Sequence, residues 1–225
     1  MVRAFIMRTL LFLLILLLPV VALQAQTPSR YAWAGISANN YRGDLEDGLF
    51  HFTPGVHVGL KLNRAKRLNG NFALGYGTVS GQDPDFNPTV QPPIAPNKYF
   101  STTFFTADYS LQLNLIKKEH FHLYLSQGIG LFRYNPKDEQ DRELQDLGTT
   151  RPVDETYGNI SIQFPSALGA AFFLPNQWGF GLQASYLNPL TDYIDNISRL
   201  GSSKGNDQVL QFRLMLLLPL QGAGE

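Results

Sequence analysis

The chain has 225 residues, no cysteine, and 18 basic against 18 acidic residues. The missing cysteines exclude a disulfide scaffold and thiolate metal or redox sites, and the neutral charge gives no reason to expect nucleic-acid binding. Only 16% of the residues are charged, whereas 12% are aromatic. Low charge and many aromatics, without long apolar runs in the body of the chain, are typical of an outer-membrane β-barrel.

The N-terminal segment has the three-part order of a secretory signal peptide. Arg3 and Arg8 are its basic region, the apolar run 10–23 follows, and Ala25 precedes the expected cleavage point. The rival interpretation, a membrane anchor, fits less well because the run is short and contains Pro19. We therefore expect a signal peptide at 1–25 and one exported domain at 26–225, which is mildly acidic after the loss of two arginines.

Period-two alternation dominates the rest of the chain and predicts strands with one apolar face. In the segment 54–63, for example, apolar side chains alternate with Gly55, His57, Gly59, Lys61 and Asn63. Eight strands are predicted, at about 31–41, 54–63, 70–81, 99–115, 121–134, 159–174, 178–187 and 207–218. Several exceed the usual globular strand and reach the roughly 9–11 residues that a membrane-spanning strand needs.

The connections alternate between long and short, which is the pattern of outer-membrane barrels with long outer loops and short periplasmic turns. The long connections are 42–53, 82–98, 135–158 and 188–206, and the short ones are 64–69, 116–120 and 175–177. The sequence thus predicts an all-β, eight-stranded antiparallel transmembrane barrel in the outer membrane of a Gram-negative-type bacterium. Outer-membrane lipid is its expected surrounding, with no cofactor and no soluble small-molecule substrate.

Apolar side chains should face the lipid and polar ones the interior. The polar face is rich in glycine, which suits a narrow eight-stranded interior filled by side chains. The expected interior polar residues are His57, Lys61, Asp108, Gln112 and Arg213. We expect the three charged ones to form an ion-paired plug, since unpaired charges there are costly; lining a channel is the alternative.

Aromatic residues near the strand ends are expected to form interfacial girdles. They are Tyr31, Trp33, Tyr76, Tyr99, Phe121, Tyr134, Trp178 and Tyr186. Two residues fit the scheme poorly. Pro165 lies inside a strand pattern and predicts a bulge, and Gln127 falls on the lipid face, which suggests a register shift nearby. The first strand does not declare its faces.

Few residues suggest chemistry. His57 is the candidate for lipid A deacylation or palmitoyl transfer, but no local Ser-His or Glu-His pattern accompanies it, and interior packing is preferred. His120 and His122 are too few for a metal site. An acidic loop could bind calcium, but it lacks EF-hand spacing, and we interpret it as a solvated loop. Its acidic residues are Asp138, Glu139, Asp141, Glu143, Asp146, Asp154 and Glu155.

The tripeptide Arg42-Gly43-Asp44 matches a cell-adhesion signal. A short motif remains a hypothesis until its structural context confirms it. The structural interpretation is that Gly43 permits a turn after the first strand and that Asp44 caps this turn by local hydrogen bonding. We favour the structural interpretation.

Several motifs occur together in one order: "NNYRGDL", "LNGNFALGYGTVSGQD", "LSQGIGLFRYNPK", "LGTTRP" and "NPLTDYIDNIS". As a set they resemble the PorG-like family of outer-membrane barrels, found in bacteria that use the type IX secretion system, and they cover roughly residues 31–218. The signature residues are Asn40, Tyr41, Gly43, Asp44 and Leu45 after the first strand, and Thr191, Asp192, Tyr193 and Asp195 in the last loop.

The resemblance implies a non-enzymatic barrel that anchors periplasmic secretion-machinery proteins in the outer membrane. It supplies no catalytic residues. The proline-rich second loop and the C-terminal tail depart from the family pattern. Two other functions remain open from the residues alone: a small pore or barrel for hydrophobic ligands, and a lipid-modifying enzyme.

Overall fold

The computed structural model describes residues 28–202 and 205–220, so the expected signal peptide lies outside the described residues. The described chain forms nine strands and one short 3-10 helix, η1 (Leu144–Asp146). The strands are β1 (Arg30–Arg42), β2 (Thr53–Leu62), β3 (Leu68–Gln82), β4 (Tyr99–Lys117), β5 (Phe121–Lys137), β6 (Ile160–Gln163), β7 (Ser166–Phe173), β8 (Gly179–Leu187) and β9 (Gln208–Pro219). All eight predicted strand positions are confirmed, with β6 and β7 sharing one of them.

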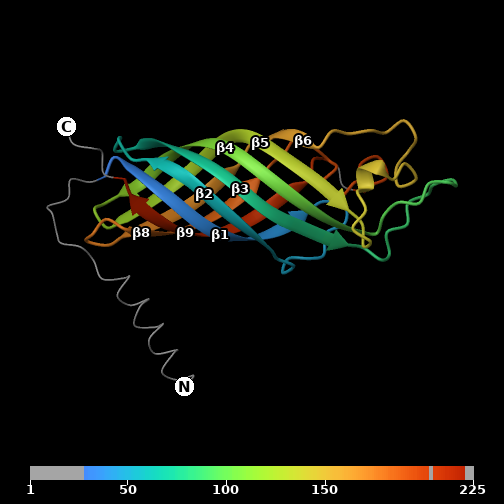
Figure 1. Ribbon diagram of the computed structural model, residues 1–225, viewed down its shortest axis with the longest axis horizontal. Helices are drawn as coiled ribbons and strands as arrows, with labels where there is room; N and C mark the ends of the chain where they lie inside the picture. The colour runs from blue at the N-terminus through green and yellow to red at the C-terminus, as the bar shows by residue number, and fades with distance from the viewer. Residues whose placement is uncertain (1–27, 203–204, 221–225) are drawn as a thin grey trace, which may run out of the picture.

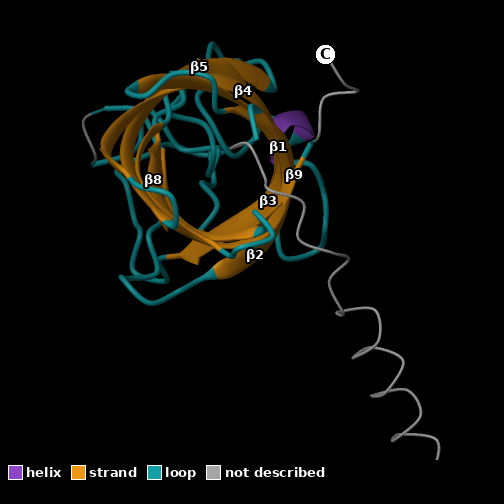
Figure 2. Cartoon of the chain, turned by 90° about the vertical axis from the view of Figure 1, so that its left-hand side faces the viewer, coloured by secondary structure: helices purple, strands orange, loops and turns teal. Residues whose placement is uncertain are grey.

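The strands close into an antiparallel barrel (Figures 1 and 2). Each strand pairs with its neighbour in sequence except β6 and β7, which follow one another along β5 and both pair with it. Strand β1 pairs with both β2 and β9, which closes the ring. Closure leaves no free edge, so ladder hydrogen bonds satisfy the backbone groups of the wall. The predicted fold class is correct.

The break between β6 and β7 differs from the expectation. The pairs Gly130↔Gln163 and Gln127↔Ser166 keep the same register on both sides of Pro165, so no residue is inserted and the predicted bulge is wrong. Gln127 does face outward, without a register shift. Its amide nitrogen donates to the Pro165 carbonyl at 3.3 Å and its amide oxygen accepts from Ser166 Oγ at 2.7 Å. The side chain thus supplies polar contacts where the proline ladder is interrupted. The pairing of β4 with β5 is instead irregular between Asn114 and Ile116.

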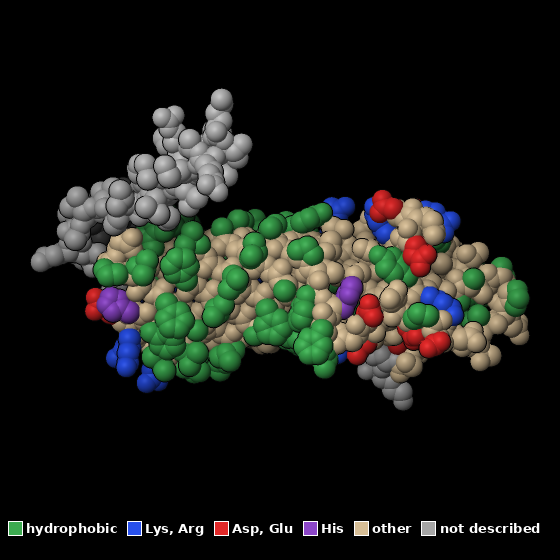
Figure 3. All heavy atoms as spheres, turned by 90° about the horizontal axis from the view of Figure 1, so that it is seen from below, with side chains coloured by type: hydrophobic (Ala, Val, Ile, Leu, Met, Phe, Trp, Pro, Cys, Tyr) green, Lys and Arg blue, Asp and Glu red, His purple; other side chains and the backbone are tan. Residues whose placement is uncertain are grey.

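The apolar face of the wall points outward, as predicted. Val56, Phe72 and Leu214 each expose more than half of their surface, whereas the polar residues that alternate with them are buried. Figure 3 shows apolar side chains over the middle of the molecule and charged side chains toward its two ends. This is the inverse of a soluble barrel and matches a lipid-facing belt. No described helix is long and apolar enough to cross a membrane.

The predicted girdle is correct for some aromatics and wrong for others. Tyr76, Trp178 and Tyr186 are exposed on the wall, but Tyr31, Trp33 and Tyr134 are buried. The error follows from judging aromatics by their nearness to a strand end. In β1 the odd-numbered positions 31, 33, 37, 39 and 41 point inward, and the first strand carries too little alternation to reveal this from sequence.

The short turns lie together at one end of the barrel and the long loops at the other (Figure 1). With the usual placement of short turns in the periplasm, the end with the long loops is the outer end. The outer loops occupy 43–52, 83–98, 138–159 and 188–207, and they hold 15 acidic and five basic residues.

Candidate functional site: the outer cap and the barrel interior

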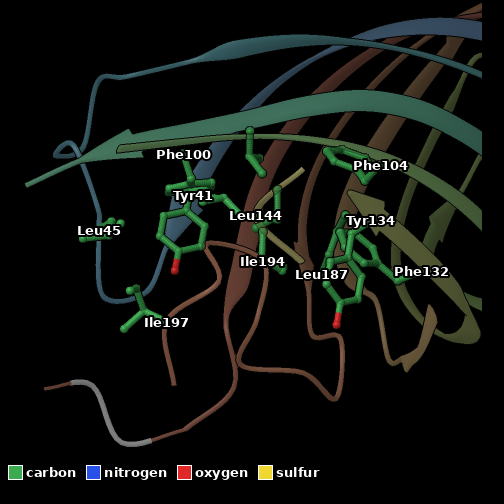
Figure 4. Packing of buried hydrophobic residues seen from close by; sticks show 12 residues of the cluster. Tyr41, Leu45, Phe100, Phe104, Phe132, Tyr134, Leu144, Leu187, Ile194 and Ile197 are labelled. Carbon is green, nitrogen blue, oxygen red and sulfur yellow. The ribbon is translucent and has the colours of Figure 1, made fainter. Parts of the chain in front are cut away.

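The outer mouth of the barrel is closed by an apolar cluster, here called the outer cap (Figure 4). The first and last outer loops bring Leu45, Ile194 and Ile197 against the outer ends of the strands, and all three are 0–1% exposed. The cluster comprises Tyr41, Leu45, Val79, Phe100, Phe104, Phe132, Tyr134, Leu144, Leu187, Ile194, Ile197 and Val209. Burial of these side chains holds the loops in the mouth.

Two buried carboxylates organise the cap. The Tyr41 hydroxyl donates to Asp207 Oδ1 at 2.6 Å, and the Ile194 amide donates to Asp207 Oδ2 at 2.8 Å. Asp195 accepts the Leu45 amide at 3.2 Å and the Ile197 amide at 2.8 Å. Each carboxylate therefore satisfies backbone donors that the loops would otherwise leave buried without partners.

Asp44 and Gly43 have roles other than those expected. Asp44 Oδ1 accepts the Ser202 amide at 2.8 Å, which connects the first outer loop to the last across 158 positions, rather than acting only as a local cap. Gly43 does not adopt a left-handed conformation. A Cβ there would lie 1.9 Å from the Tyr41 hydroxyl and 2.1 Å from Asp207 Oδ1. Glycine is thus required by close approach, and Gly43 and Asp44 lie against residues that hold the outer cap together.

The remaining signature residues also lie at this end. The Tyr134 and Thr191 hydroxyls are 2.8 Å apart, and Tyr193 stacks on Tyr157 with ring centroids at 4.4 Å. Asn40 donates to two carbonyls of the first outer loop, at 2.9 and 3.0 Å. Asp192 is half-buried, and the charges of Asp44 and Glu155 act on its carboxyl group. The structure thus brings the two signature segments, far apart in sequence, into one cap.

Burial dominates the titration of the cap carboxylates. It raises the pKa of both Asp195 and Asp207 above the ordinary carboxyl value of 3.8. Nearby negative charges raise both pKa values further, that of Asp44 acting on Asp195 and those of Asp195 and Asp192 acting on Asp207. The pKa of Asp192 rises to about 6, first through burial and then through the charges of Asp44 and Glu155. The cap therefore favours protonated carboxyl groups more than an open loop would.

Arg151 is a buried residue of the outer end whose contacts were not expected from the sequence, although it belongs to the motif "LGTTRP". Its guanidinium is buried and donates to Asn196 Oδ1 at 2.7 Å and to the Leu144 carbonyl at 2.8 Å. Asn196 in turn donates to Thr150 Oγ1 at 3.0 Å. This network joins the third and last outer loops. The contact between Arg151 and Asn196 spans 45 positions, so no local sequence pattern could predict it.

The acidic third loop shows no cation site. Among the described residues, no group of three or more His, Asp or Glu side chains is arranged to hold a metal ion. Asp138 instead pairs with Arg142 at 2.6 Å and Asp154 with Arg199 at 2.7 Å. The expectation of a wholly solvated loop is wrong for Glu155, which is 4% exposed and lies 3.8 Å from the Arg199 guanidinium.

The interior polar residues point inward as predicted, but the ion-paired plug is wrong. Among the described residues, no ion pair within 4 Å joins Lys61, Asp108 and Arg213. Asp108 accepts a hydrogen bond from the Gln163 amide, and Arg213 donates to Gln211 Oε1 at 2.6 Å. Neutral amides therefore hold these charges in place of opposite charges.

Aromatic rings complete the interior. The Lys61 ammonium lies 4.4 Å from the centre of the Tyr124 ring, and the Arg213 guanidinium lies 5.3 Å from the Trp33 ring. Contacts of this kind stabilise a cation without a carboxylate. Gln112 is also buried inside the wall at 3% exposure. The predicted residues line one lumen without forming a single cluster.

His57 has a partner that the sequence did not reveal. Its Nε2 lies 2.9 Å from Ser37 Oγ, which reaches it from the neighbouring strand, and Ser37 Oγ also donates to Asn39 Oδ1 at 2.9 Å. His57 Nδ1 is buried without a hydrogen-bond partner among the described residues. A base oriented for nucleophilic catalysis normally has a third group on that nitrogen, so the pair has a dyad's spacing without its orienting residue.

Side chains also fill the periplasmic half of the lumen. A second apolar cluster lies there, consisting of Tyr31, Trp33, Ala73, Ala171, Phe173, Met215 and Leu217. A cavity of about 30 Å³, lined by residues that include Asp108, Gln183 and Arg213, lies within the lumen. That volume suits a water molecule or two and no larger solute. The lumen is packed rather than open.

The closed eight-stranded wall, its apolar outer belt and its filled polar lumen define an outer-membrane β-barrel protein. No protein-family model matches the chain, and no curated protein matches it. Among solved structures, it is similar to Neisserial surface protein A (NspA), at 11% identity and a TM-score of 0.52, covering 85% of this chain and 97% of that one.

It is also similar to Ail, the attachment invasion locus protein of Yersinia pestis, solved in complex with the heparin analogue sucrose octasulfate. Identity is 8% and the TM-score 0.50, with 86% of this chain and 99% of that chain covered. At such identities the similarity establishes the fold alone.

Proposed function

We propose that the protein is a non-enzymatic, PorG-like anchor of a type IX secretion complex, which holds periplasmic machinery proteins at the outer membrane. The observation that carries the proposal is the convergence of the signature segments. Tyr41 and Leu45 from the first segment meet the last outer loop, where Asp195 binds the Leu45 amide. The residues behind the family resemblance are thus the ones that close the outer mouth.

The filled lumen supports an anchor over a pore. The outer cap blocks one end and the second apolar cluster fills the other. Planar-bilayer recording tests this: the folded protein is expected to give no conductance steps, whereas discrete steps would favour the pore.

The lumen offers little space for a hydrophobic ligand, because its cavity is small. A larger apolar groove lies on the outer wall of the barrel instead. This groove has a volume of about 790 Å³ and includes Val58, Phe180 and Leu214, which are exposed in the lipid-facing belt. Membrane lipid is therefore its natural occupant. A ligand comparable to that of Ail is also disfavoured, because acids outnumber bases threefold in the outer loops and would repel a polysulfated molecule.

The anchoring role is tested in a deletion strain. We expect the deletion strain to lose type IX secretion and the full-length gene to restore it. We also expect crosslinking in intact outer membranes to recover periplasmic machinery proteins with the barrel. Normal secretion and no such recovery would remove the secretion role.

The Ser37–His57 contact keeps a lipid-modifying activity as a second candidate. Both side chains are at least 90% buried, which argues against access of a lipid substrate. Mass spectrometry of lipid A decides the matter. Identical lipid A in wild-type, deletion and His57→Ala strains is expected, and a species that disappears on deletion and with His57→Ala would establish the enzyme.

A further inference from the structure

The periplasmic end carries a cluster of exposed cations on two neighbouring turns. The turn between β2 and β3 contributes Arg64, Lys66 and Arg67. Lys117 at the end of β4 and Lys118 in the turn that follows it complete the cluster. All are exposed except Lys117, which is intermediate. We call these five residues the basic rim. Charged side chains gather at this end of the molecule in Figure 3.

Backbone contacts make the two turns one surface. The Lys117 ammonium donates to the Ala65 carbonyl at 2.8 Å, and Asn114 bonds the Lys66 carbonyl through its side chain at 3.1 Å and the Arg67 carbonyl through its amide at 2.7 Å. The turn between β2 and β3 is thereby held against the end of β4. The basic rim is a fixed patch rather than a set of separate loose turns.

The cations of the basic rim have no carboxylate partner. Among the described residues none of the five forms an ion pair, and the acid of this end, Glu119, lies 4.0 Å from His120. At the outer end, by contrast, Arg42, Lys137, Arg142 and Arg199 are all paired with carboxylates at 2.6–3.1 Å. Four cations at the outer end are thus paired with carboxylates, whereas none of the five cations of the basic rim is.

The rim is also one-sided. The remaining described turn, 174–177 between β7 and β8, carries no charged residue. Lipid headgroups surround a barrel on every side, and a patch that served them alone would have no reason to concentrate on two adjoining turns. A one-sided patch suits a partner that approaches from one direction.

We propose that the basic rim is the docking surface for an acidic face of a periplasmic protein. This inference rests on the proposed anchoring function and identifies the surface and the partner's chemistry. Free cations on a fixed surface steer an acidic partner into register and accelerate its association, and salt weakens the effect. Docking at this end leaves the outer cap untouched.

The test uses the full-length protein in nanodiscs and a fluorescent glutamate-rich peptide, with a glutamine-rich peptide of equal length as the neutral probe. The variant Lys66→Glu/Arg67→Glu reverses two cations whose carbonyls, but not whose side chains, form hydrogen bonds among the described residues. The control Lys98→Glu/Arg199→Glu makes the same change in net charge at the outer end. Heat-modifiable gel mobility checks that every sample is folded.

Wild type and control are expected to bind the acidic peptide with similar, salt-sensitive affinity. The rim variant should bind it about tenfold more weakly or worse, the scale of electrostatic steering by a few charges. The neutral peptide should not bind. Equal binding by the rim variant, or equal loss in the control, would overturn the proposal.

Nanodiscs of phosphatidylcholine and of phosphatidylglycerol separate protein docking from lipid contact. Peptide binding in both is expected. Binding that vanishes in phosphatidylglycerol discs, at an ionic strength where the phosphatidylcholine discs retain it, would mean that headgroups occupy the rim and would overturn docking of a protein.

The proposed docking surface and the proposed secretion role can be refuted independently. If the deletion strain secretes normally while Lys66→Glu/Arg67→Glu still loses peptide binding, the secretion role is wrong and the surface stands. If secretion needs the protein but the folded rim variant secretes as well as wild type, the surface is wrong and the anchor role stands.

Discussion

The two ends of this barrel treat charge in opposite ways. At the outer end, loops rich in acid fold into the mouth and bury Asp195 and Asp207 among hydrogen-bond donors, and four cations there are paired with carboxylates. At the periplasmic end, short turns display cations that no described carboxylate neutralises. The proposed docking of an acidic periplasmic protein on the basic rim accounts for this difference.

The largest test of the outer end is Gly43→Val. The added side chain would collide with the Tyr41 hydroxyl and Asp207 Oδ1, so we expect the cap to open while the lipid-embedded wall survives. Limited proteolysis of the outer loops in intact cells should show much faster cleavage. Gly148→Val is the matched control, because nothing lies within 4 Å of its Cβ position. Equal protease resistance in the two variants would contradict the close-packed cap.

The next test is the pH dependence of the cap. Because burial raises the pKa of Asp195, to about 7, and that of Asp207, the closed cap retains protons that opened loops release above their ordinary value of 3.8. The closed cap is therefore most stable in acid, and its stability falls as pH rises toward 7. Hydrogen exchange of the Ile194 and Ile197 amides, corrected for intrinsic rates, should accelerate over that range.

Asp207→Asn should flatten this pH profile because it removes one of the cap carboxyl groups whose pKa is raised, and Asp146→Asn on the exposed loop surface should leave it unchanged. Protection that increases from pH 4 to 7 would show that the carboxylates stabilise the cap in their charged form.

A smaller effect is expected from Arg42→Ala. It removes the pair with Glu46, at 3.1 Å, which lies at the surface. Exposed pairs of this kind contribute at most about 1 kcal/mol, so protease resistance and thermal unfolding should stay close to wild type. A collapse like that of Gly43→Val would show that the arginine, and with it the adhesion tripeptide, matters more than the glycine.

The smallest effect is expected from Lys66→Ala/Arg67→Ala at the basic rim. Their side chains have no partner among the described ion pairs, so removing them should leave the thermal unfolding temperature unchanged or slightly raised through lower self-repulsion. A marked loss of stability would mean that the rim serves the fold, and the contrast between the ends would lose its functional meaning.

Much of the fold could be predicted from sequence because alternation is a local property. The alternation of Val56, His57 and Val58 predicts which side chains face the lipid and which the interior within three positions. The loop lengths predict which end of the barrel is the outer one. Strand β1 could not be assigned this way, since small residues occupy both faces, alanines the outward one and Gly35 the inward one, and Trp33 gives no sign that it points inward. Tyr31 was misplaced for the same reason. Tyr134 lies on β5 and was misplaced because an aromatic near a strand end was expected on the outer wall.

The site was less predictable because its contacts are long-range. The inward direction of Asp108 and Arg213 followed from alternation, but their neutral partners Gln163 and Gln211 depended on barrel register. Gly43 was singled out correctly for a reason that proved wrong. Its neighbour in space, Asp207, lies at the far end of the chain, and no local turn rule could have found it.

Site-specific photocrosslinking in living cells tests the central contrast most directly. A photoreactive amino acid is placed at Lys66 on the basic rim, at Asn176 on the uncharged turn, and at Asp146 in the outer loops. The account predicts a strong crosslink to a periplasmic protein from position 66, a weaker one or none from 176, and none from 146. Crosslinks to a protein from position 146 with none from 66 would contradict it.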